Sequence, residues 1–317
     1  MSAQANLKTI PRLAPDEIES PPLSLGELTW RKFRRHKMAI FGVVVLILLI
    51  FYTFGGAFFV SENYANKTDT KIRLQPPSTA HRFGTDTIGR DILARTIYGG
   101  QISLLIGLTA MTLETLVGIL IGASAGYYGG WLDNILMRFT EAMLNLPQIL
   151  ILIVMAKYFG GKLPNISFLG RTYSGSVIVI ILIIGLTSWP YLARIVRAEF
   201  LSIKENEFIL AARATGTPPL QIIFRHILPN CIAPIVVSAT LGVANAITLE
   251  AYISFLGLGV QPPTATWGNM LERAYNFIEM APWLWIFPGT LIVLIVLAIN
   301  FLGDGLRDAL DPRSRTV

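Results

Sequence analysis

Long runs of uncharged, mostly apolar residues dominate the pattern of this chain. The first runs from Met38 to Val60 without a charge, and an apolar helix needs about 20 residues to cross a bilayer. From Gly99 to Leu132 the one charged residue is Glu114, and the turn-rich segment Ala123–Trp131 divides two spans. The pattern predicts six membrane-spanning helices: 38–60, a second after residue 99, a third from about 134, and others near 174–193, 232–255 and 282–302.

The distribution of Lys and Arg indicates how these spans are oriented. The basic cluster Arg31–Lys37, the stretch Arg194–Arg225 and the C-terminal arginines fall on the same side of a six-span arrangement. The positive-inside rule makes that side, with both termini, cytoplasmic. A basic cluster beside an apolar run anchors to anionic lipid, so we expect contact with membrane lipid and no nucleic acid.

Composition supports a membrane protein. Of 317 residues, 53% are hydrophobic and 15% charged, whereas about 25% charged residues are usual in soluble domains. This balance excludes a water-soluble enzyme. The single cysteine, Cys231, excludes an internal disulfide framework.

The chain divides into five predicted segments. In the outer loop, Asp86 is expected to cap a short amphipathic helix, in which Ile88, Ile92 and Leu93 recur at helical spacing and Asp91 precedes Arg95 by four residues. The segments are a flexible cytoplasmic tail (1–29), a basic anchor with the first transmembrane helix (30–60), an extracytoplasmic loop with that amphipathic helix (61–98), a core of five transmembrane helices with a cytoplasmic loop at about 198–230 (99–303), and a cytoplasmic tail (304–317).

No catalytic or metal-binding motif is present, so we expect no catalytic residue, metal or cofactor in this chain. The segment Gly160–Lys162 lacks the other residues of a phosphate-binding loop, and the three histidines lie far apart. Charged residues inside spans are expensive and are functional candidates by default. Glu114 is central in its span and is either a proton carrier or a neutral structural group, whereas Glu141 and Glu250 lie nearer span ends, where an interfacial or capping role is expected.

The cytoplasmic stretch Glu205–Asn230 encodes a helix, a break and a second helix. Good helix formers extend to Ala214, Gly216 suits a left-handed cap, and Thr217 and Pro218 suit the start of the next helix, which Pro229 ends. The residues alone leave two interpretations open. The short helix is either a part pushed by a partner outside the bilayer or an ordinary connection.

A resemblance decides between them. LAARATG (Leu210–Gly216) followed by HILPN (His226–Asn230) resembles the EAA loop of ATP-binding-cassette (ABC) importer permeases, although Leu210 stands where the family usually has Glu and His226 replaces the common Ile. Further segments resemble the C-type permeases of dipeptide and oligopeptide importers. They are WRKFRRHKMAIFG, FGTDTIGRDILAR, EAYISFLGLGVQPPTATWGNML and GDGLRDALDPR, at 30–42, 83–95, 250–271 and 303–313.

The resemblance implies an all-α integral membrane protein with the type I ABC importer (MetI-like) fold. It implies a non-catalytic permease subunit in a bacterial or archaeal plasma membrane, paired with a related B-type permease. Two cytoplasmic ATPase subunits would bind ATP and Mg, and an extracytoplasmic protein would deliver substrate. The implied ATPase-coupling residues are Leu210, Ala211, Ala212, Gly216, Thr217 and Pro229; the implied outer-gate or binding-protein contacts are Asp86, Arg90, Asp91, Gln261 and Trp267.

Two other classes stay open as alternatives. A secondary transporter would use Glu114 as its proton carrier, and an intramembrane scaffold protein would transport nothing. Within the peptide-importer branch the sequence does not distinguish dipeptides, oligopeptides, nickel chelates or glutathione as substrates.

Overall fold

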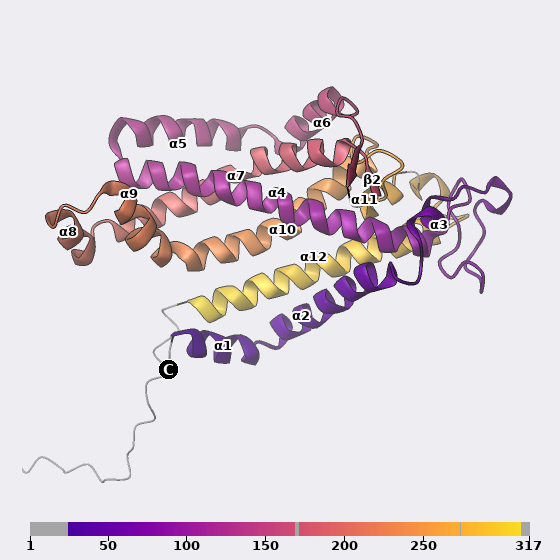
Figure 1. The fold of residues 1–317 in the computed structure, drawn as a ribbon, viewed down its shortest axis with the longest axis horizontal. Coiled ribbons are helices and arrows are strands. Elements are labelled where there is room, and N and C mark those ends of the chain that lie inside the picture. The colour runs from indigo at the N-terminus through magenta and orange to yellow at the C-terminus, as the bar shows by residue number, and fades with distance from the viewer. Residues whose placement is uncertain (1–24, 169–170, 273, 312–317) are drawn as a thin grey trace, which may run out of the picture.

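The computed structural model describes residues 25–168, 171–272 and 274–311, and its long helices lie side by side along one axis (Figure 1). Five helical segments are long and apolar enough to cross a membrane, and a bent pair of helices makes a sixth. The expected all-α membrane fold is therefore confirmed. The long helices are α2 (Lys37–Ile50, continued by a π-helical turn, Phe51–Gly55), α4 (Ile92–Tyr128), α7 (Ser176–Ile203), α10 (Ile232–Phe255) and α12 (Trp283–Leu310).

The third span is broken. Helices α5 (Gly130–Asn145) and α6 (Gln148–Phe159) meet at an angle of 85°. Between them Leu146 adopts an extended backbone, with φ −83° and ψ 132°. Pro147 explains this conformation, because a residue before proline is pushed out of the helical region.

Small residues bring α4 and α7 into close contact. A Cβ atom placed on Gly122 would lie 2.4 Å from the carbonyl oxygen of Ala193, and one on Gly126 would lie 2.6 Å from Cβ of Phe200. Such spacing of small residues is how helices approach closely in membranes. The α4–α7 pair therefore forms a tightly packed centre of the bundle.

Both predicted tails are shorter than the sequence suggested. Helix α1 (Leu25–Arg35) includes residues 25–29, and α12 continues to Leu310. His36 separates α1 from α2 by capping α2, since its Nδ1 accepts from the Ala39 N–H at 3.0 Å. Residues 1–24 and 312–317 lie outside the described residues.

The predicted amphipathic helix around Asp86 is wrong. Helix α4 begins only at Ile92, and Asp91 is its N-cap, accepting from the Ala94 N–H at 2.8 Å. Gly89 has φ +79°, which interrupts any helix before Asp91. The helical spacing seen in the sequence thus belongs to the buried first turn of a transmembrane helix, where Ile92 is 1% exposed.

Short elements complete the end of the bundle at the right of Figure 1, which is called the outer end below. A two-stranded antiparallel hairpin pairs Ile166 with Tyr173. The elements are α3 (Glu62–Asn66), a 3-10 turn (Thr70–Ile72), β1 (Ile166–Phe168), β2 (Arg171–Tyr173), α11 (Trp267–Met270) and a second 3-10 turn (Ala274–Phe277).

Candidate functional site

Helix α8 (Glu207–Ala214) lies at the left end of the bundle (Figure 1). It ends in a Schellman motif, in which Gly216 N–H donates to the Arg213 carbonyl and Thr217 N–H to the Ala212 carbonyl, at 3.0 and 3.1 Å. Gly216 has φ +76°, the left-handed conformation that the sequence predicted. The helix starts two residues later than expected, after Asn206.

One apolar side chain anchors α8 to the bundle. Ile209 is fully buried in a cluster that joins α4, α7, α8 and the start of α10. Close packing of this cluster fastens α8 to α4, α7 and α10 together. The other buried members are Ala123, Leu192, Val196, Phe200, Ile222, Ile223, Ile227, Cys231 and Ile235.

The candidate coupling residues do not share one face. Leu210 is 48% exposed and Ala211 is also exposed, whereas Ala212 packs against the Ile209 cluster. Ala212 is half-buried against this cluster, and the contact of either alanine with a partner stays a prediction. Phe208 of α8 is exposed as well, so α8 presents a second large apolar side chain at the surface.

The segment after Gly216 also differs from expectation. The side chain of Thr217 does not cap the next helix; Pro218 takes the N-cap position of α9 (Pro219–Gln221). Pro229 does not end the helix, because a π-helical turn (Ile222–Ile227) passes into a 3-10 turn (Leu228–Cys231) and then into α10. Pro229 is tolerated because it lies at the start of that turn, where an N–H is not needed.

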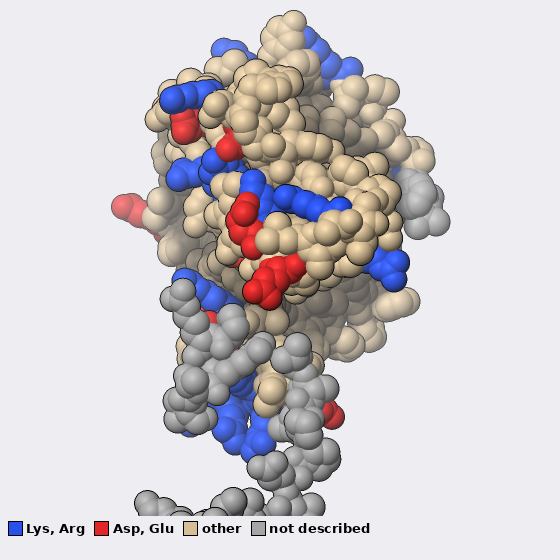
Figure 2. Space-filling view, turned by 90° about the vertical axis from the view of Figure 1, so that its left-hand side faces the viewer, with Lys and Arg blue, Asp and Glu red and all other residues tan. Residues whose placement is uncertain are grey.

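Polar contacts tie the same end together. The Arg197 guanidinium on α7 donates to both carboxylate oxygens of Asp133 on α5, at 2.5 and 2.6 Å. Lys204 Nζ donates to the Gly126 carbonyl near the end of α4 at 3.1 Å. Figure 2 shows this end of the molecule, with charged side chains scattered over a largely uncharged surface.

A cavity of about 920 Å³ extends between α4, the bend of α5 and α6, α7, α10 and α12. Glu114 lines it, and Glu114 Oε2 is buried without a hydrogen-bond partner among the described residues. At the bend, Gln148 Nε2 donates to Ser188 Oγ at 2.9 Å. Asn245 of α10 is another polar residue in the lining.

The other two intramembrane carboxylates differ sharply. Glu141 is exposed and pairs with Arg138 at 3.1 Å. Glu250 is 0% exposed and accepts from Ser254 Oγ at 2.7 Å and from Ser103 Oγ at 3.3 Å. The bond from Ser103 joins α4 to α10, whereas the bond from Ser254 lies within α10, so Glu250 is a buried hydrogen-bonding group in this structure.

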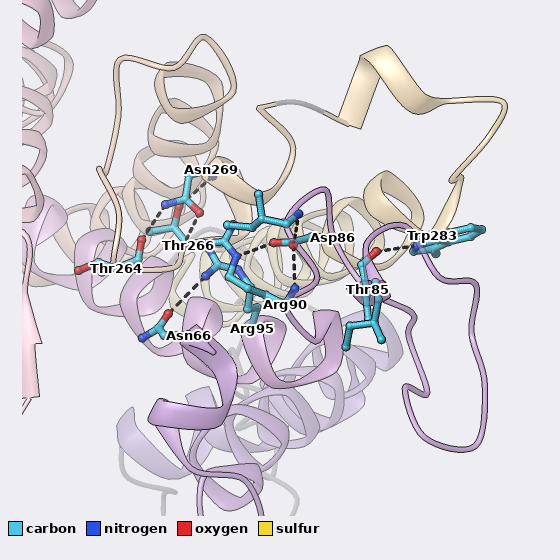
Figure 3. A network of polar contacts seen from close by, with 11 residues as sticks. Asn66, Thr85, Asp86, Arg90, Arg95, Thr264, Thr266, Asn269 and Trp283 are labelled. Carbon is cyan, nitrogen blue, oxygen red and sulfur yellow. Dashed lines mark hydrogen bonds and ion pairs between the residues drawn. The ribbon is translucent and has the colours of Figure 1, made fainter. Parts of the chain in front are cut away.

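A polar network occupies the outer end of the bundle (Figure 3). Asp86 Oδ2 accepts from Arg90 Nε at 2.6 Å, and its Oδ1 accepts from the backbone N–H groups of Ile88 and Arg90 at 2.9 Å. Asp91 pairs with His81 at 2.8 Å. The predicted Asp91–Arg95 pair is absent from the ion pairs of the described residues, because Asp91 serves as the cap of α4.

Two residues singled out by the sequence position the loop before α12. Trp267 is 0% exposed, and its Nε1 donates to the Thr96 carbonyl at 2.8 Å. Such burial excludes direct contact between Trp267 and a docked binding protein. The Gln261 backbone N–H donates to Ser176 Oγ at 2.9 Å, which ties this loop to the start of α7.

The Asp133–Arg197 ion pair and the burial of Ile209 were not predicted from the sequence. Asp133 and Arg197 are 64 residues apart, and the burial of Ile209 depends on helices distant along the chain. Apolar spacing on α8 gives the one available signal for Ile209. No group of three or more His, Cys, Asp or Glu arranged to hold a metal occurs in the described part of the chain.

Two family models match the chain. Residues 118–316 match the binding-protein-dependent transport system inner membrane component. Residues 24–77 match the N-terminal transmembrane domain of oligopeptide transport permease C. The chain therefore belongs to the family of binding-protein-dependent transport system inner membrane components.

Individual proteins agree with this assignment. A putative peptide permease protein of Brucella suis biovar 1 is 43% identical over 93% of this chain and 94% of its own. The dipeptide transport system permease protein DppC of Alkalihalophilus pseudofirmus is 40% identical over 96% of each chain. An inward-facing structure of the MetNI methionine ABC transporter contains a chain with a TM-score of 0.52 at 21% identity, covering 67% of this chain and 95% of that one.

Family and fold together define the class of protein. The chain is a multi-pass inner-membrane permease subunit of an ABC importer, with the type I importer fold. Such a subunit does not hydrolyse ATP; partner ATPases do, and a further permease and a substrate-binding protein complete the importer. Membership of this family argues against the alternative that the chain is a proton-driven carrier.

Proposed function

We propose that this chain is one half of a permease heterodimer that imports dipeptides or oligopeptides. Its partners are a related B-type permease, two cytoplasmic ATPase subunits that bind ATP and Mg, and an extracytoplasmic peptide-binding protein. Both termini lie in the cytoplasm of a bacterial or archaeal cell, and the basic cluster Arg31–Lys37 contacts anionic lipid. The peptide and dipeptide permeases that share about 40% identity with the chain support this substrate class.

The observation that carries the proposal is the construction of α8. Its outer face presents Leu210 and Ala211, while Ile209 and Ala212 connect it to the bundle. Closure of the ATPases on ATP pushes this helix, and the Ile209 cluster passes the movement to α4, α7 and α10. Gly216, Thr217 and Pro229 set the path of the chain that leaves it.

The outer end takes the complementary role. Asp86, Arg90, Asp91 and Gln261 hold the surface on which the binding protein docks, and buried Trp267 supports it as part of the outer gate. The cavity beside Glu114 is this chain's share of the translocation pathway. Glu114 acts there as a structural group, Glu250 acts as one between α10 and α4, and exposed Glu141 lies at the membrane interface.

A labelling experiment tests the orientation behind this proposal. Cys231 is fully buried, so new cysteines label against a low background. We expect a membrane-impermeant maleimide to label Lys67→Cys in intact cells and to spare Thr217→Cys until the cells are opened. Labelling of Thr217→Cys in intact cells would contradict the orientation.

Co-expression tests the assembly. The chain purified alone is expected neither to bind ATP nor to transport, whereas co-expression with its genomic neighbours yields a complex containing a second permease and ATPases. A homo-oligomer that transports without ATPases would point to the proton-coupled carrier instead.

A further inference from the structure

Arg95 is a buried cation with almost no partner. Its side chain lies in the first turn of α4, and the residue is 4% exposed. A guanidinium carries five N–H donors. Among the described residues, its one hydrogen-bond acceptor is Asn66 Oδ1, at 3.4 Å from Arg95 Nη1. This distance is long for a hydrogen bond, since N–H···O contacts cluster near 2.9–3.0 Å.

The neighbouring carboxylates are engaged elsewhere. Asp86 is held by Arg90 and by two backbone N–H groups. Asp91 is held by His81 and by the backbone at the start of α4. Glu272 lines the same pocket as Arg95, but no ion pair within 4 Å joins their side chains in the described residues. A buried charge left in this condition is expensive unless another group pairs with it.

A pocket of about 200 Å³ adjoins Arg95. Arg90 and Asn269 also line the pocket (Figure 3), where Arg90 Nε donates to Asp86 and Asn269 Nδ2 donates to the Val260 and Thr264 carbonyls. One water molecule takes about 30 Å³ of liquid volume, so the pocket has room for one small polar group with some water. The lining includes Asp86, Arg90, Arg95, Asn269, Met270 and Glu272.

We infer that Arg95 binds a single carboxylate group that enters this pocket from the extracytoplasmic side. A guanidinium matches a carboxylate with two parallel hydrogen bonds, and Lys cannot reproduce that geometry. The inference rests on the proposed function for its orientation and partners. The carboxylate comes either from the C-terminus of the arriving peptide or from an Asp or Glu side chain of the binding protein.

The test uses the complete transporter reconstituted with its binding protein. The variants are Arg95→Gln, which removes the charge, Arg95→Lys, which keeps it without the forked geometry, and Arg82→Gln as a matched control. Arg82 lies on the same outer segment, is exposed and does not line the pocket. Acetate serves as the probe for a free carboxylate, and acetamide is its neutral control.

Acetate is expected to inhibit wild-type uptake or docking more strongly than acetamide, and Arg95→Gln is expected to abolish this difference. If the peptide supplies the carboxylate, amidating its C-terminus raises KM about tenfold or more in the wild type and leaves Arg95→Gln unchanged. If the binding protein supplies the carboxylate, Arg95→Gln weakens docking of the binding protein about tenfold or more. This loss is then the same whether the bound peptide has a free or an amidated C-terminus. Arg82→Gln behaves as the wild type in each case.

Three results would overturn the inference. The first is that Arg95→Gln equals Arg82→Gln in KM and in docking, and the second is that acetate and acetamide inhibit equally. Loss of both Arg95→Gln and Arg95→Lys from the membrane, with Arg82→Gln retained, would show that Arg95 only supports the fold. By contrast, a wild-type complex that shows no ATP-dependent uptake would contradict the proposed function itself.

Discussion

The two ends of the helical bundle are held by different kinds of contact. At the outer end, buried Glu250 and half-buried Asp86 and Asn269 make several hydrogen bonds each. At the other end, α8 depends on buried Ile209 and leaves Leu210 exposed. Hydrogen-bonded polar groups fix one arrangement, although Arg95 among them lacks a close partner, whereas an apolar anchor leaves the neighbouring side of α8 exposed. The outer end is thus fixed mainly by polar contacts within the chain, and the α8 end is fixed mainly by apolar packing around Ile209.

The largest effect is expected from Trp267→Ala at the outer end. The indole is fully buried and lies against Gly100, where an added Cβ would be 2.5 Å from the ring. Truncating a buried Trp costs about 3–5 kcal/mol, and the Thr96 carbonyl loses its donor. The midpoint of thermal unfolding of the purified chain should fall clearly. Trp131→Ala is the control, because Trp131 is 74% exposed. An equal fall of the unfolding midpoint in both variants would contradict the claim that the buried contacts of Trp267 hold the outer end together.

A smaller effect is expected from Gly216→Val at the α8 end. No atom lies within 4 Å of an added Cβ, so the cost comes from the backbone alone, at φ +76°. Such strain costs about 1–3 kcal/mol and misdirects the chain after α8. Less ATPase should co-purify with Gly216→Val, at unchanged membrane levels. Gly216→Asn should stay near the wild type because Asn tolerates this conformation; if both variants bind ATPase equally, the cap does not matter for coupling.

The smallest effect is expected from Glu114→Gln. Gln keeps the shape and hydrogen-bonding capacity of Glu and removes its titratable proton. An ATP-driven permease should keep uptake within about twofold of the wild type, because no proton transfer drives it. Uptake in proteoliposomes, with ATPase coupling measured in parallel, checks this expectation. Loss of uptake with coupling intact would favour the carrier alternative.

The spans and the helix cap were predictable because both depend on local sequence. The length of an apolar run sets a span, and Gly216 after good helix formers sets a left-handed cap. Leu146–Pro147 carried a local signal for the 85° bend between α5 and α6, although the pattern predicted only where that span starts.

Other features were not predictable because they depend on contacts between distant segments. The spacing of Asp91 and Arg95 suits a helical ion pair, but Asp91 caps α4 and pairs with His81 instead. Ala212 looked equivalent to Ala211 in the sequence, but Ala212 is half-buried against the Ile209 cluster whereas Ala211 is exposed. Glu250 lies near a helix end in sequence, and only the packing of α4 against α10 buries it.

The most direct test of the coupling role of α8 compares Ala211→Trp with the wild type. Ala211 is exposed, so the added ring leaves the fold of this chain intact and obstructs only what docks on α8; added bulk in a packed contact costs about 1–3 kcal/mol. We predict that Ala211→Trp stays in the membrane at wild-type levels while co-purified ATPase and transport-linked ATP hydrolysis fall together. If Ala211→Trp retains its ATPases and transports normally, α8 is only a connector and the account is contradicted.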